Sequence, residues 1–540
     1  MGPSRLWTGK SLLRAAVLFE TSFFWYEHIF SPRQRFSAHD GDTPRLRSAT
    51  IASCAQNGLR PLFASGDCLS CKAWAQVAGD GKLSEDESEQ KLRLRVVRHR
   101  GSKHRLRGMK QTALNAMADV VLSDLGTEIG WGQWLATIYI FCMGAAVPLA
   151  SYLQRKLSVR SLILYSYGHY LIGSLCDCLA VNFPMLIIGR VLEALGTGVL
   201  MPLLQTIAMT RFPENRHGTA MGIAGIALGF APNIGPVVGG ALCTAFSWRA
   251  MFLILACASA VLIVCALAVV REREVEDAAA HLDVTSLVFS TFGFGGLLLG
   301  FTAAANMGLT EPLVWAPVLV GIACVALFVT RQHTISEPLL DLRIFTFREY
   351  RVSIVAQCLL YGCFMGMTLI IPLTVIEAGG HNAFEAGLVL FPGALAALVF
   401  EPGAGMATDR FGARKVAIFG GCFLVVGALL CSIVPSDAPL WLMALGQTLR
   451  CVGLTTLIPT TTSWGLGSLG KAGLTTHGSA GMIMSRQIAA SLATAVMVFL
   501  IGCFPLSGEY MGFHVALGFS ALLALGCLLV VIAKIPRSRK

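Results

Sequence analysis

The chain alternates between long apolar runs and short polar connections along most of its length. From Trp134 onward each run has about twenty residues, enough to cross the ~30 Å hydrocarbon core of a bilayer as an α-helix. Continuous runs exclude the alternating pattern of barrel strands, and a helix satisfies its own backbone in lipid. The pattern therefore predicts an all-α polytopic membrane protein with thirteen spans, near residues 134–153, 162–182, 184–210, 219–245, 250–270, 284–305, 313–330, 352–376, 386–406, 416–434, 440–461, 480–503 and 513–534.

Positively charged residues mark alternate connections between these runs. The connections 306–312, 377–385, 435–439 and 504–512 contain no Lys or Arg. Cytoplasmic loops of membrane proteins are enriched in Lys and Arg, so we expect the basic connections and the C-terminus on the cytoplasmic side of the cell membrane. The basic residues that support this topology are Arg155, Lys156, Arg160, Arg211, Arg216, Arg271, Arg273, Arg331, Arg343, Arg348, Arg351, Arg410, Arg414, Lys415, Lys471, Lys534, Arg537, Arg539 and Lys540.

The composition narrows the class of protein. Hydrophobic residues make up 55% of the 540 residues and charged residues only 14%, with a mean hydropathy of +0.66. Soluble domains carry roughly 25% charged residues and do not hide this much apolar surface from water. An ordinary soluble protein, a disordered chain and a nucleic-acid binder are therefore excluded for the apolar part of the chain.

The net charge of +11 is unevenly distributed. Residues 1–110 hold 19 Lys and Arg against 10 Asp and Glu, a net of +9, whereas residues 111–540 hold 23 against 21, a net of +2. The stretch 91–110 contains nine Lys and Arg and no acid. Such a segment favours the cytoplasmic side, but an odd number of spans places it outside. The conflict indicates that one helix is missing before the first predicted span.

Residues 11–30 are a poor substitute for that helix. They carry Arg14, Glu20 and Glu27, and each charge costs ~2.5–3.5 kcal/mol at a helix centre. Residues 113–130 are too short and too polar.

The seventeen cysteines do not form the pattern of a disulfide framework or a metal site. Most lie in apolar runs, where Cys behaves as a small hydrophobic residue. We interpret Cys68 and Cys71 as an incidental pair, because no second pair or His cluster completes a zinc site. No phosphate-binding loop, zinc-protease or serine-hydrolase motif is present in the sequence. We therefore expect no catalytic residue, no metal and no cofactor, and a protein that is not an enzyme.

The stretch 231–240 combines prolines and glycines inside an apolar run. Proline removes a backbone donor and bends a helix, while glycine lets a neighbouring helix approach closely. A plain packing helix is the alternative, since small residues four apart are common in membranes. We favour a functional bend, formed by Pro232, Gly235, Pro236, Gly239 and Gly240.

A second motif lies in the basic connection 405–415. An acid sits among basic residues there, and a glycine is available for the positive φ of a tight turn. A degraded copy lies 254 residues earlier, with Ser151 in place of the first glycine and Arg155 in place of the acid. Two copies at matching helix ends indicate an internal repeat. The motif residues are Gly405, Asp409, Arg410, Gly412, Arg414 and Lys415.

Several ionisable residues lie within the apolar runs. Arg190 and Glu193 are three residues apart, so they share a helix face and can pair; intramembrane ionisable residues usually mark a transport path. A static ion pair is an equal alternative. Glu401 is a second embedded acid, with an interfacial position as its alternative. We interpret Arg450 and Arg486 as snorkelling residues near helix ends and His477 as a loop residue.

Together these motifs resemble the major facilitator superfamily, specifically its fourteen-helix drug:proton antiporter family. The resemblance runs from about Leu114 to Ile532. The family's usual Gln in its helix-four motif is Glu193 here, and the Gly that follows it is Ala194. The matching stretches are 405–415 for the cytoplasmic-loop motif, 231–240 for the antiporter motif, 190–196 for the helix-four motif, and 247–249, 338–342 and 486–488.

The resemblance implies the major facilitator fold: two six-helix bundles with two extra helices between them. The bundles are expected at 113–270 and 350–534, the extra helices at 284–330 and a cytoplasmic tail at 535–540. Residues 1–112 replace the family's first helix and resemble nothing in it. We expect them to come from a misassigned start or a frame disruption; a thirteen-span variant is the alternative.

The resemblance also implies alternating access and proton-coupled export of drugs or other small amphipathic compounds. Its protonatable candidates are Glu193 and Glu401, with Arg190 beside an acid. The expected partners are a small-molecule substrate, protons and the lipid bilayer, with no nucleic acid and a monomeric protein. A uniporter, an importer of a metabolite and a non-functional relic are the alternatives. Weak candidates for the substrate cavity are Gln357, Tyr361, Arg486 and Gln487.

Overall fold

A computed structural model describes the chain at residues 121, 124–127, 133–225, 247–270, 281–307, 311–381, 383–435, 438–504 and 509–536. These residues belong to one compact unit. The predictions made for 1–112 and for the proline–glycine stretch 231–240 lie outside them.

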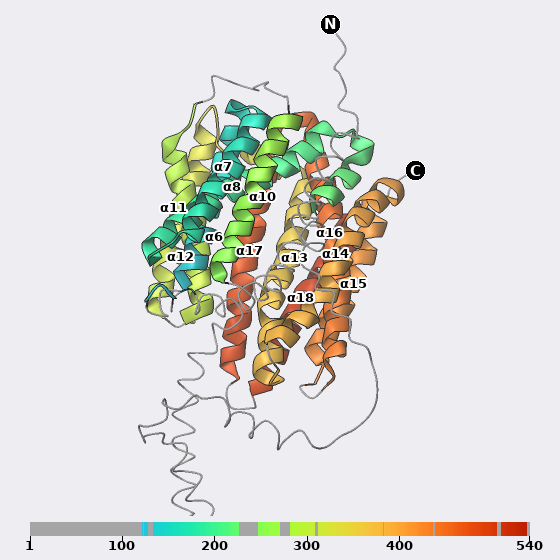
Figure 1. The fold of residues 1–540 in the computed structure, drawn as a ribbon. Helices are drawn as coiled ribbons and strands as arrows, with labels where there is room; N and C mark the ends of the chain where they lie inside the picture. Colours follow the sequence, from blue (N-terminus) through green and yellow to red (C-terminus); the bar gives the residue numbers. More distant parts are fainter. Residues whose placement is uncertain are drawn as a thin grey trace, which may run out of the picture. The chain divides into compact units, whose positions relative to one another are not determined.

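Long helices make up almost all of the described residues and run alongside one another (Figure 1). They are α6 (Gln133–Lys156), α7 (Val159–Cys178), α8 (Phe183–Arg211), α10 (Trp248–Val269), α11 (Val284–Met307), α12 (Pro312–Thr334), α13 (Arg348–Leu373), α14 (Ala383–Phe411), α15 (Ala413–Ile433), α16 (Leu440–Gly467), α17 (Thr475–Cys503) and α18 (Glu509–Lys534). Residues 217–225 are also helical. Short 3₁₀ helices occur at Glu214–Arg216, Leu342–Thr346 and Gly470–Ala472, and a π-helical turn at Thr374–Ala378 continues α13.

Local sequence signals explain how these helices begin and end. Asn182 caps α8, because its Oδ1 accepts a hydrogen bond from the backbone N–H of Met185 at 3.0 Å, and Pro184 stands in the first turn. Gly412 joins α14 to α15 within one residue and has a φ of 85°. That conformation favours glycine, as the sequence predicted for this turn.

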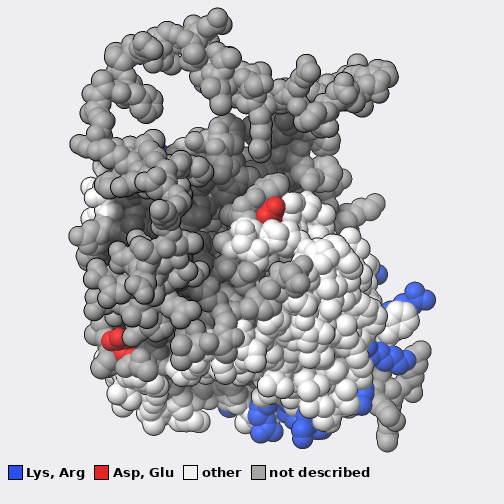
Figure 2. All heavy atoms as spheres, turned by 90° about the horizontal axis from the view of Figure 1, so that it is seen from below, with Lys and Arg blue, Asp and Glu red and all other residues white. Residues whose placement is uncertain are grey.

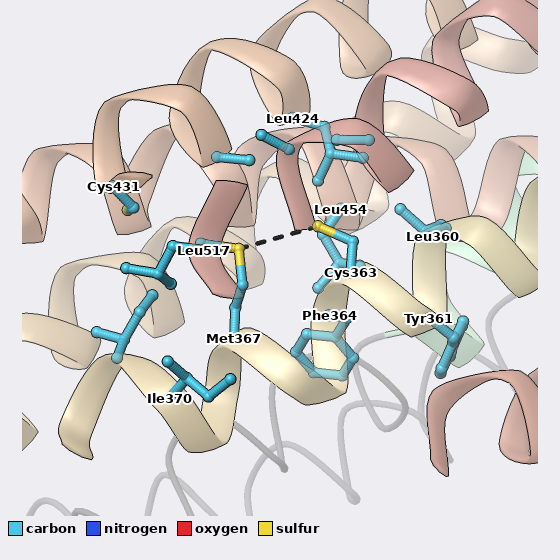
Figure 3. Close-up of a cluster of buried hydrophobic side chains, with 14 of the residues drawn as sticks. Leu360, Tyr361, Cys363, Phe364, Met367, Ile370, Leu424, Cys431, Leu454 and Leu517 are labelled. Atoms are coloured by element: carbon cyan, nitrogen blue, oxygen red, sulfur yellow. Dashed lines mark hydrogen bonds between the residues drawn. The ribbon is translucent and has the colours of Figure 1, made fainter. Parts of the chain in front are cut away.

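The helices α13 to α18 pack extensively on one another. Their contact encloses the largest cluster of buried apolar side chains, part of which is shown in Figure 3. Phe364 and Met367 of α13, Leu454 of α16 and Leu517 of α18 are among its fully buried or nearly fully buried members. Earlier in the chain, α8 packs on α6 and α7, and α7 packs on α10.

The helices α11 and α12 form a close pair. Glycines of α11 allow this, since a Cβ on Gly296 would lie 2.9 Å from the Pro317 carbonyl oxygen of α12. Asp283, before α11, accepts hydrogen bonds from the guanidinium of Arg331 on α12 at 2.7 and 2.9 Å. The helix α11 also contacts α6 and α17, so it touches helices from both parts of the chain.

Ten helices among the described residues are long and apolar enough to cross a membrane. The helices α6 and α7 form where spans were predicted but are not among the ten, and the predicted span 219–245 is described only at its start. Many large apolar side chains are exposed along the helices, such as Val399 at 70% and Leu522 at 66%, as lipid contact requires. Seen from below, the described surface is largely uncharged, with Lys and Arg gathered along part of its rim (Figure 2).

Candidate functional site

The crossing of α7 and α8 brings buried charged side chains together. Glycines allow the two backbones to touch: a Cβ on Gly173 would lie 2.6 Å from the Gly189 carbonyl oxygen and 2.8 Å from Glu193 Cγ. A side chain larger than hydrogen at either glycine would separate the helices. The two glycines therefore allow the Glu193 side chain to lie against the backbone of α7, where it is shielded from water.

Glu193 is fully buried and has two partners for its carboxylate. Arg190 Nη1 donates to Oε2 at 2.9 Å, and Ser174 Oγ donates to Oε1 at 2.7 Å. The guanidinium of Arg190 also lies 5.7 Å from the ring centroid of Tyr139 and 5.3 Å from that of Phe252. The predicted pairing of Arg190 with Glu193 is present; whether either takes part in transport remains a prediction.

Asp177 is a buried acid that the sequence reasoning missed. It is fully buried at the end of α7, and neither of its carboxylate oxygens has a hydrogen-bond partner. A Cβ on Gly189 would overlap its carboxyl group, with Cγ only 2.6 Å away. The signal was available, because an acid inside the apolar run 162–182 is a functional residue by default.

A stripe of glycines joins residues 217–225 to α14. Positions for a Cβ on Gly218, Gly222 and Gly225 all lie within 2.7 Å of α14 atoms. Glu401 faces Gly225, is fully buried, and has no hydrogen-bond partner for either carboxylate oxygen. The interfacial position considered for Glu401 is therefore wrong: it lies within a contact between helices.

Asp409 forms hydrogen bonds at one end of the contact between α14 and residues 217–225. Its carboxylate accepts hydrogen bonds from the backbone N–H of Gly218 at 2.7 Å, the N–H of Thr219 at 2.7 Å and the Thr219 hydroxyl at 2.6 Å. A carboxylate at the first turn of a helix satisfies free backbone donors and favours the helix dipole. Asp409 thus links the loop motif to a helix almost two hundred residues earlier in the chain.

The other residues of the loop motif lie around this link. Gly405 packs against Gly218 and Gly222, with a Cβ position 3.0 Å from Gly222 Cα. Arg414 donates to the carbonyl oxygen of Ile535 at 2.5 Å, which fastens the chain after α18. Arg410 and Lys415 are exposed, and Arg410 lies over the ring of its neighbour Phe411.

The degraded copy of the motif lies at the corresponding contact of α6 with α17. The tetrad from His217 to Ala220 is repeated 260 residues later from His477 to Ala480, with Ser479 in place of Thr219. In α6 the position that corresponds to Asp409 is Arg155. The positive charge of Arg155 acts on the imidazole of His477. In the same turn of α6, Ser151 Oγ and both side-chain polar atoms of Gln154 are buried without a hydrogen-bond partner.

His477 is not the loop residue that the sequence predicted. It lies in the first turn of α17 and is 8% exposed, and its Nδ1 accepts a hydrogen bond from the backbone N–H of Asp341 at 3.4 Å. The first turn of α17 is polar, so hydropathy alone begins this helix too late.

Arg450 and Arg486 do not snorkel to the surface. Arg450 is fully buried in the middle of α16, where its Nε donates to Gln447 Oε1 at 2.8 Å and Nη1 has no partner. Arg486 is 4% exposed, and its guanidinium lies 4.5 Å from the ring centroid of Tyr361. Both residues face the helix contacts around α13, which hydropathy cannot show.

The remaining cavity candidates have different surroundings. Gln357 is buried and donates to the hydroxyl groups of Thr461 at 2.7 Å and Thr462 at 2.8 Å, which binds α13 to α16. Gln487 is half-buried on α17. Among the described residues, no group of His, Cys, Asp and Glu has the arrangement of a metal site.

Apolar helices of membrane-spanning length, packed around buried charges, define a polytopic membrane transporter. Residues 106–494 match the family description "Major Facilitator Superfamily", and the chain belongs to this family.

Two relatives and one solved structure show the extent of the likeness. The uncharacterized MFS-type transporter YcnB of Bacillus subtilis (strain 168) is 32% identical over 391 residues, 72% of this chain and 82% of YcnB. The lincomycin resistance protein LmrB of Listeria monocytogenes is 29% identical over 395 residues, 72% of this chain and 82% of LmrB. A POT family transporter solved with a thioalcohol-conjugated peptide has a TM-score of 0.55 and 16% identity over 78% of this chain and 92% of that chain. At that identity the structure supports the fold alone.

Proposed function

We propose that this transporter exports small amphipathic compounds in exchange for protons. The observation that carries the proposal is the group of buried carboxyl groups inside the apolar helices, Asp177, Glu193 and Glu401, of which only Glu193 has a hydrogen-bond partner. Acids placed where water is excluded gain and lose protons only when a conformational change gives access to them. The resistance to lincomycin in the name of LmrB supports a drug as the exported compound.

The proposed mechanism is alternating access with a protonation step. A proton that moves inward through 100 mV supplies ~2.3 kcal/mol, which sustains a concentration ratio of about fifty-fold for an uncharged compound at complete coupling. The contact of Asp409 with residues 217–225 closes one end of the molecule, and it opens when the two halves separate there. We place the protein in the plasma membrane as a monomer, with its C-terminus in the cytoplasm, because basic residues mark that side.

Efflux of ethidium from cells that express the full chain tests the proposal. Cells loaded with ethidium should lose it faster than cells with an empty vector, and a proton uncoupler should remove the difference. Lincomycin resistance, measured as growth, is a second probe.

The rival functions give different results. A uniporter would carry ethidium only down its electrochemical gradient, so the uncoupler would not abolish its movement, and an importer would raise cellular ethidium. A chain that reaches the membrane but gives no difference from the empty vector for either probe would be a non-functional relic or a transporter of another compound, and would contradict drug export.

A further inference from the structure

Two acids at the α7–α8 crossing, Asp177 of α7 and Glu193 of α8, have opposite surroundings. Glu193 is held by the guanidinium of Arg190 and the hydroxyl of Ser174. Asp177 is equally buried, but its carboxyl group packs on the Gly189 backbone and has no hydrogen-bond partner. The surroundings of the two carboxyl groups therefore favour different protonation states.

Desolvation disfavours a charged carboxylate, and an opposite charge or a donated hydrogen bond favours it. An ionised carboxylate buried without either costs several kcal/mol and takes up a proton instead. The two donors around Glu193 suit a carboxylate that balances Arg190, whereas the surroundings of Asp177 suit a neutral acid. Of the two carboxyl groups at the crossing, that of Asp177 is therefore the one suited to hold a proton.

We propose that Asp177 is the residue that carries the exchanged proton, with Arg190 as the cation that stabilises its carboxylate after the proton leaves. This inference rests on the proposed proton-coupled function and names the residue responsible for it. It moves the coupling role from Glu193 and Glu401, the protonatable candidates of the sequence analysis, to Asp177, which lies one turn after the Ser174 that contacts Glu193.

The charged and titratable groups around Asp177 fit this role. The charges of Arg190 and Glu193 on α8 both act electrostatically on the Asp177 carboxyl group. Tyr170 lies two turns earlier on α7, and Tyr139 of α6 is adjacent to Arg190. From α10, Arg249 reaches the end of α7, where its Nη2 donates to the Ala180 carbonyl oxygen at 3.0 Å and its Nη1 pairs with Asp124. Arg249 pairs with Asp124, and Arg190 pairs with Glu193. Of the two, Arg190 is the cation whose charge acts on Asp177, so an Asp177 carboxylate would share this cation with Glu193.

Asp177 lies close to an exposed turn at the end of α7. Asp177 is the next-to-last residue of α7, and the turn that follows exposes Leu179 at 64% and Val181 at 78%. A small separation of α7 from α8 would open the carboxyl group on that side. Glu401 is also buried and unpaired, but no described cation contacts it, so a carboxylate formed there has no stabilising charge.

The proposed step is a proton transfer that forms no covalent intermediate. The O–H bond of the Asp177 carboxylic acid breaks, its proton passes to water, and the electron pair stays on the carboxylate, which pairs with Arg190. Protonation by water from the opposite side reverses the change. One proton crosses for each cycle, so its exchange for a monovalent cation such as ethidium moves no net charge, and no oxidant or co-reactant is needed.

Proteoliposomes with the purified full chain test the proposal with ethidium as the probe. An acidic lumen one pH unit below the bath supports about tenfold accumulation for one exchanged proton. Asp177→Asn, which imitates the protonated acid, should lose this acid-driven uptake and keep ethidium counterflow at equal pH. Glu214→Gln, an exposed acid in the turn after α8, is the matched control and should keep both activities.

Two further measurements distinguish a proton carrier from a packing residue. Asp177→Glu should restore acid-driven uptake with a displaced pH profile, because the longer acid has a different environment. In the unaltered protein, dicyclohexylcarbodiimide, which reacts with protonated carboxyl groups in apolar surroundings, should modify Asp177 and not Glu193, as located by mass spectrometry. This labelling does not depend on the folding of any variant.

The results separate the two proposals. Acid-driven uptake that persists in Asp177→Asn, a pH profile unmoved in Asp177→Glu, or labelling of Glu193 in place of Asp177 would overturn the assignment of Asp177. If the unaltered protein moves ethidium by counterflow but ignores the pH gradient, the proposed proton-coupled function itself fails.

Discussion

Gly189 and Asp177 occupy a space that has room for only one side chain. A Cβ on Gly189 would overlap the Asp177 carboxyl group and lie 2.8 Å from the Gly173 carbonyl oxygen. The backbone on one side cannot move without separating α7 from α8. The absence of a side chain at position 189 therefore decides both how closely the helices pack and how completely Asp177 is buried.

We predict that Gly189→Ala destabilises the protein and lowers transport. Overpacking of a close contact typically costs ~1–3 kcal/mol, which should lower the thermal unfolding midpoint in detergent by several degrees. Gly168→Ala, also on α7, is the control, because no atom lies within 4 Å of the added methyl group. It should be neutral or slightly stabilising, since Ala favours a helix over Gly by about 1 kcal/mol.

A second variant separates packing from proton chemistry. In Gly189→Ala with Asp177→Ala, the methyl group fills the space left by the carboxyl group. The unfolding midpoint should recover while acid-driven uptake stays lost. Recovery of both would show that Asp177 matters only for packing.

At the residue scale, spacing in sequence predicted local pairs but no pairs between helices. Arg190 and Glu193 are neighbours because three residues nearly complete a helical turn. The burial of Arg450 depends on Gln447 nearby and on Phe364 of α13, 86 residues earlier, which a single helix cannot show. Asp177 was detectable from its apolar surroundings, but its lack of partners was visible only in the fold.

At the scale of helices, the two halves meet at two corresponding contacts with opposite charges. At one, Asp409 of α14 accepts three hydrogen bonds from Gly218 and Thr219. At the other, Arg155 of α6 stands where that acid would be, beside the first turn of α17. A cation is unfavourable at a helix N-terminus. The charged side chain therefore stabilises the contact of α14 with residues 217–225 but not the contact of α6 with α17.

We predict that Asp409→Asn weakens the contact of α14 with residues 217–225. Hydrogen bonds to a charged group contribute ~1.5–3 kcal/mol each in favourable cases. In Asn one oxygen still accepts, but the amide nitrogen would face a backbone donor in place of the second carboxylate oxygen. The unfolding midpoint and the fraction of molecules closed at this end should both fall, the latter measured as the distance between spin labels on 217–225 and α14. Arg410→Gln, in the same motif but exposed, should change neither.

An acid introduced at position 155 should stabilise the contact of α6 with α17. We expect Arg155→Asp to stabilise the first turn of α17 by ~1 kcal/mol, as anions do at helix N-termini. Transport should become slower while the unfolding midpoint rises, because both contacts must then open in each cycle. A variant that melts earlier with an unchanged rate would contradict this reading of the repeat.

Hydropathy placed the helix boundaries to within a few residues, and the helices α13, α15 and α17 begin earlier than predicted because their first turns are polar. The helices α13 and α15 begin and end within four residues of the predicted spans 352–376 and 416–434. The helix α17 begins five residues before its predicted span, because its first turn contains Thr475, Thr476 and His477. Packing on α13 and α6 shields that turn, and hydropathy does not register packing.

At the scale of the whole molecule, the pair α11–α12 touches both parts of the chain through α6 and α17. The link of Asp283 to Arg331 fastens this pair at one end. Hydrogen bonds from Arg331, aided by one from Ser286, lower the pKa of the Asp283 carboxyl group to about 2. The acid is therefore more readily ionised in the folded protein than in the unfolded chain, where its pKa is about 3.9.

This shift predicts how stability depends on pH. A lowered pKa in the folded state gives a stabilisation that is complete above the unfolded pKa, declines below about 4 and is lost as the pH falls through about 2. Asp283→Asn should remove this component, so its unfolding midpoint should fall less steeply than that of the unaltered protein over this range. Parallel curves for the two proteins would contradict the prediction.

The overall architecture was predictable because lipid leaves the backbone few choices. A chain that spans a bilayer must form helices or a closed barrel, and the length of each apolar run sets the length of each helix. The order in which helices contact one another came from the resemblance and the fold, since apolar runs of similar composition carry little information about their neighbours.

The reactivity of the buried cysteines reports the unfolding of this transporter. All thirteen cysteines in the described residues are free thiols; Cys363, Cys431, Cys451 and Cys527 are fully buried, whereas Cys257, Cys422 and Cys503 are exposed. A maleimide dye reaches the buried sulfur atoms only after the helices α13 to α18 come apart. Fluorescence from a dye added during heating therefore follows the loss of this core directly, and replacing the exposed thiols with serine would lower its starting signal without disturbing the buried reporters.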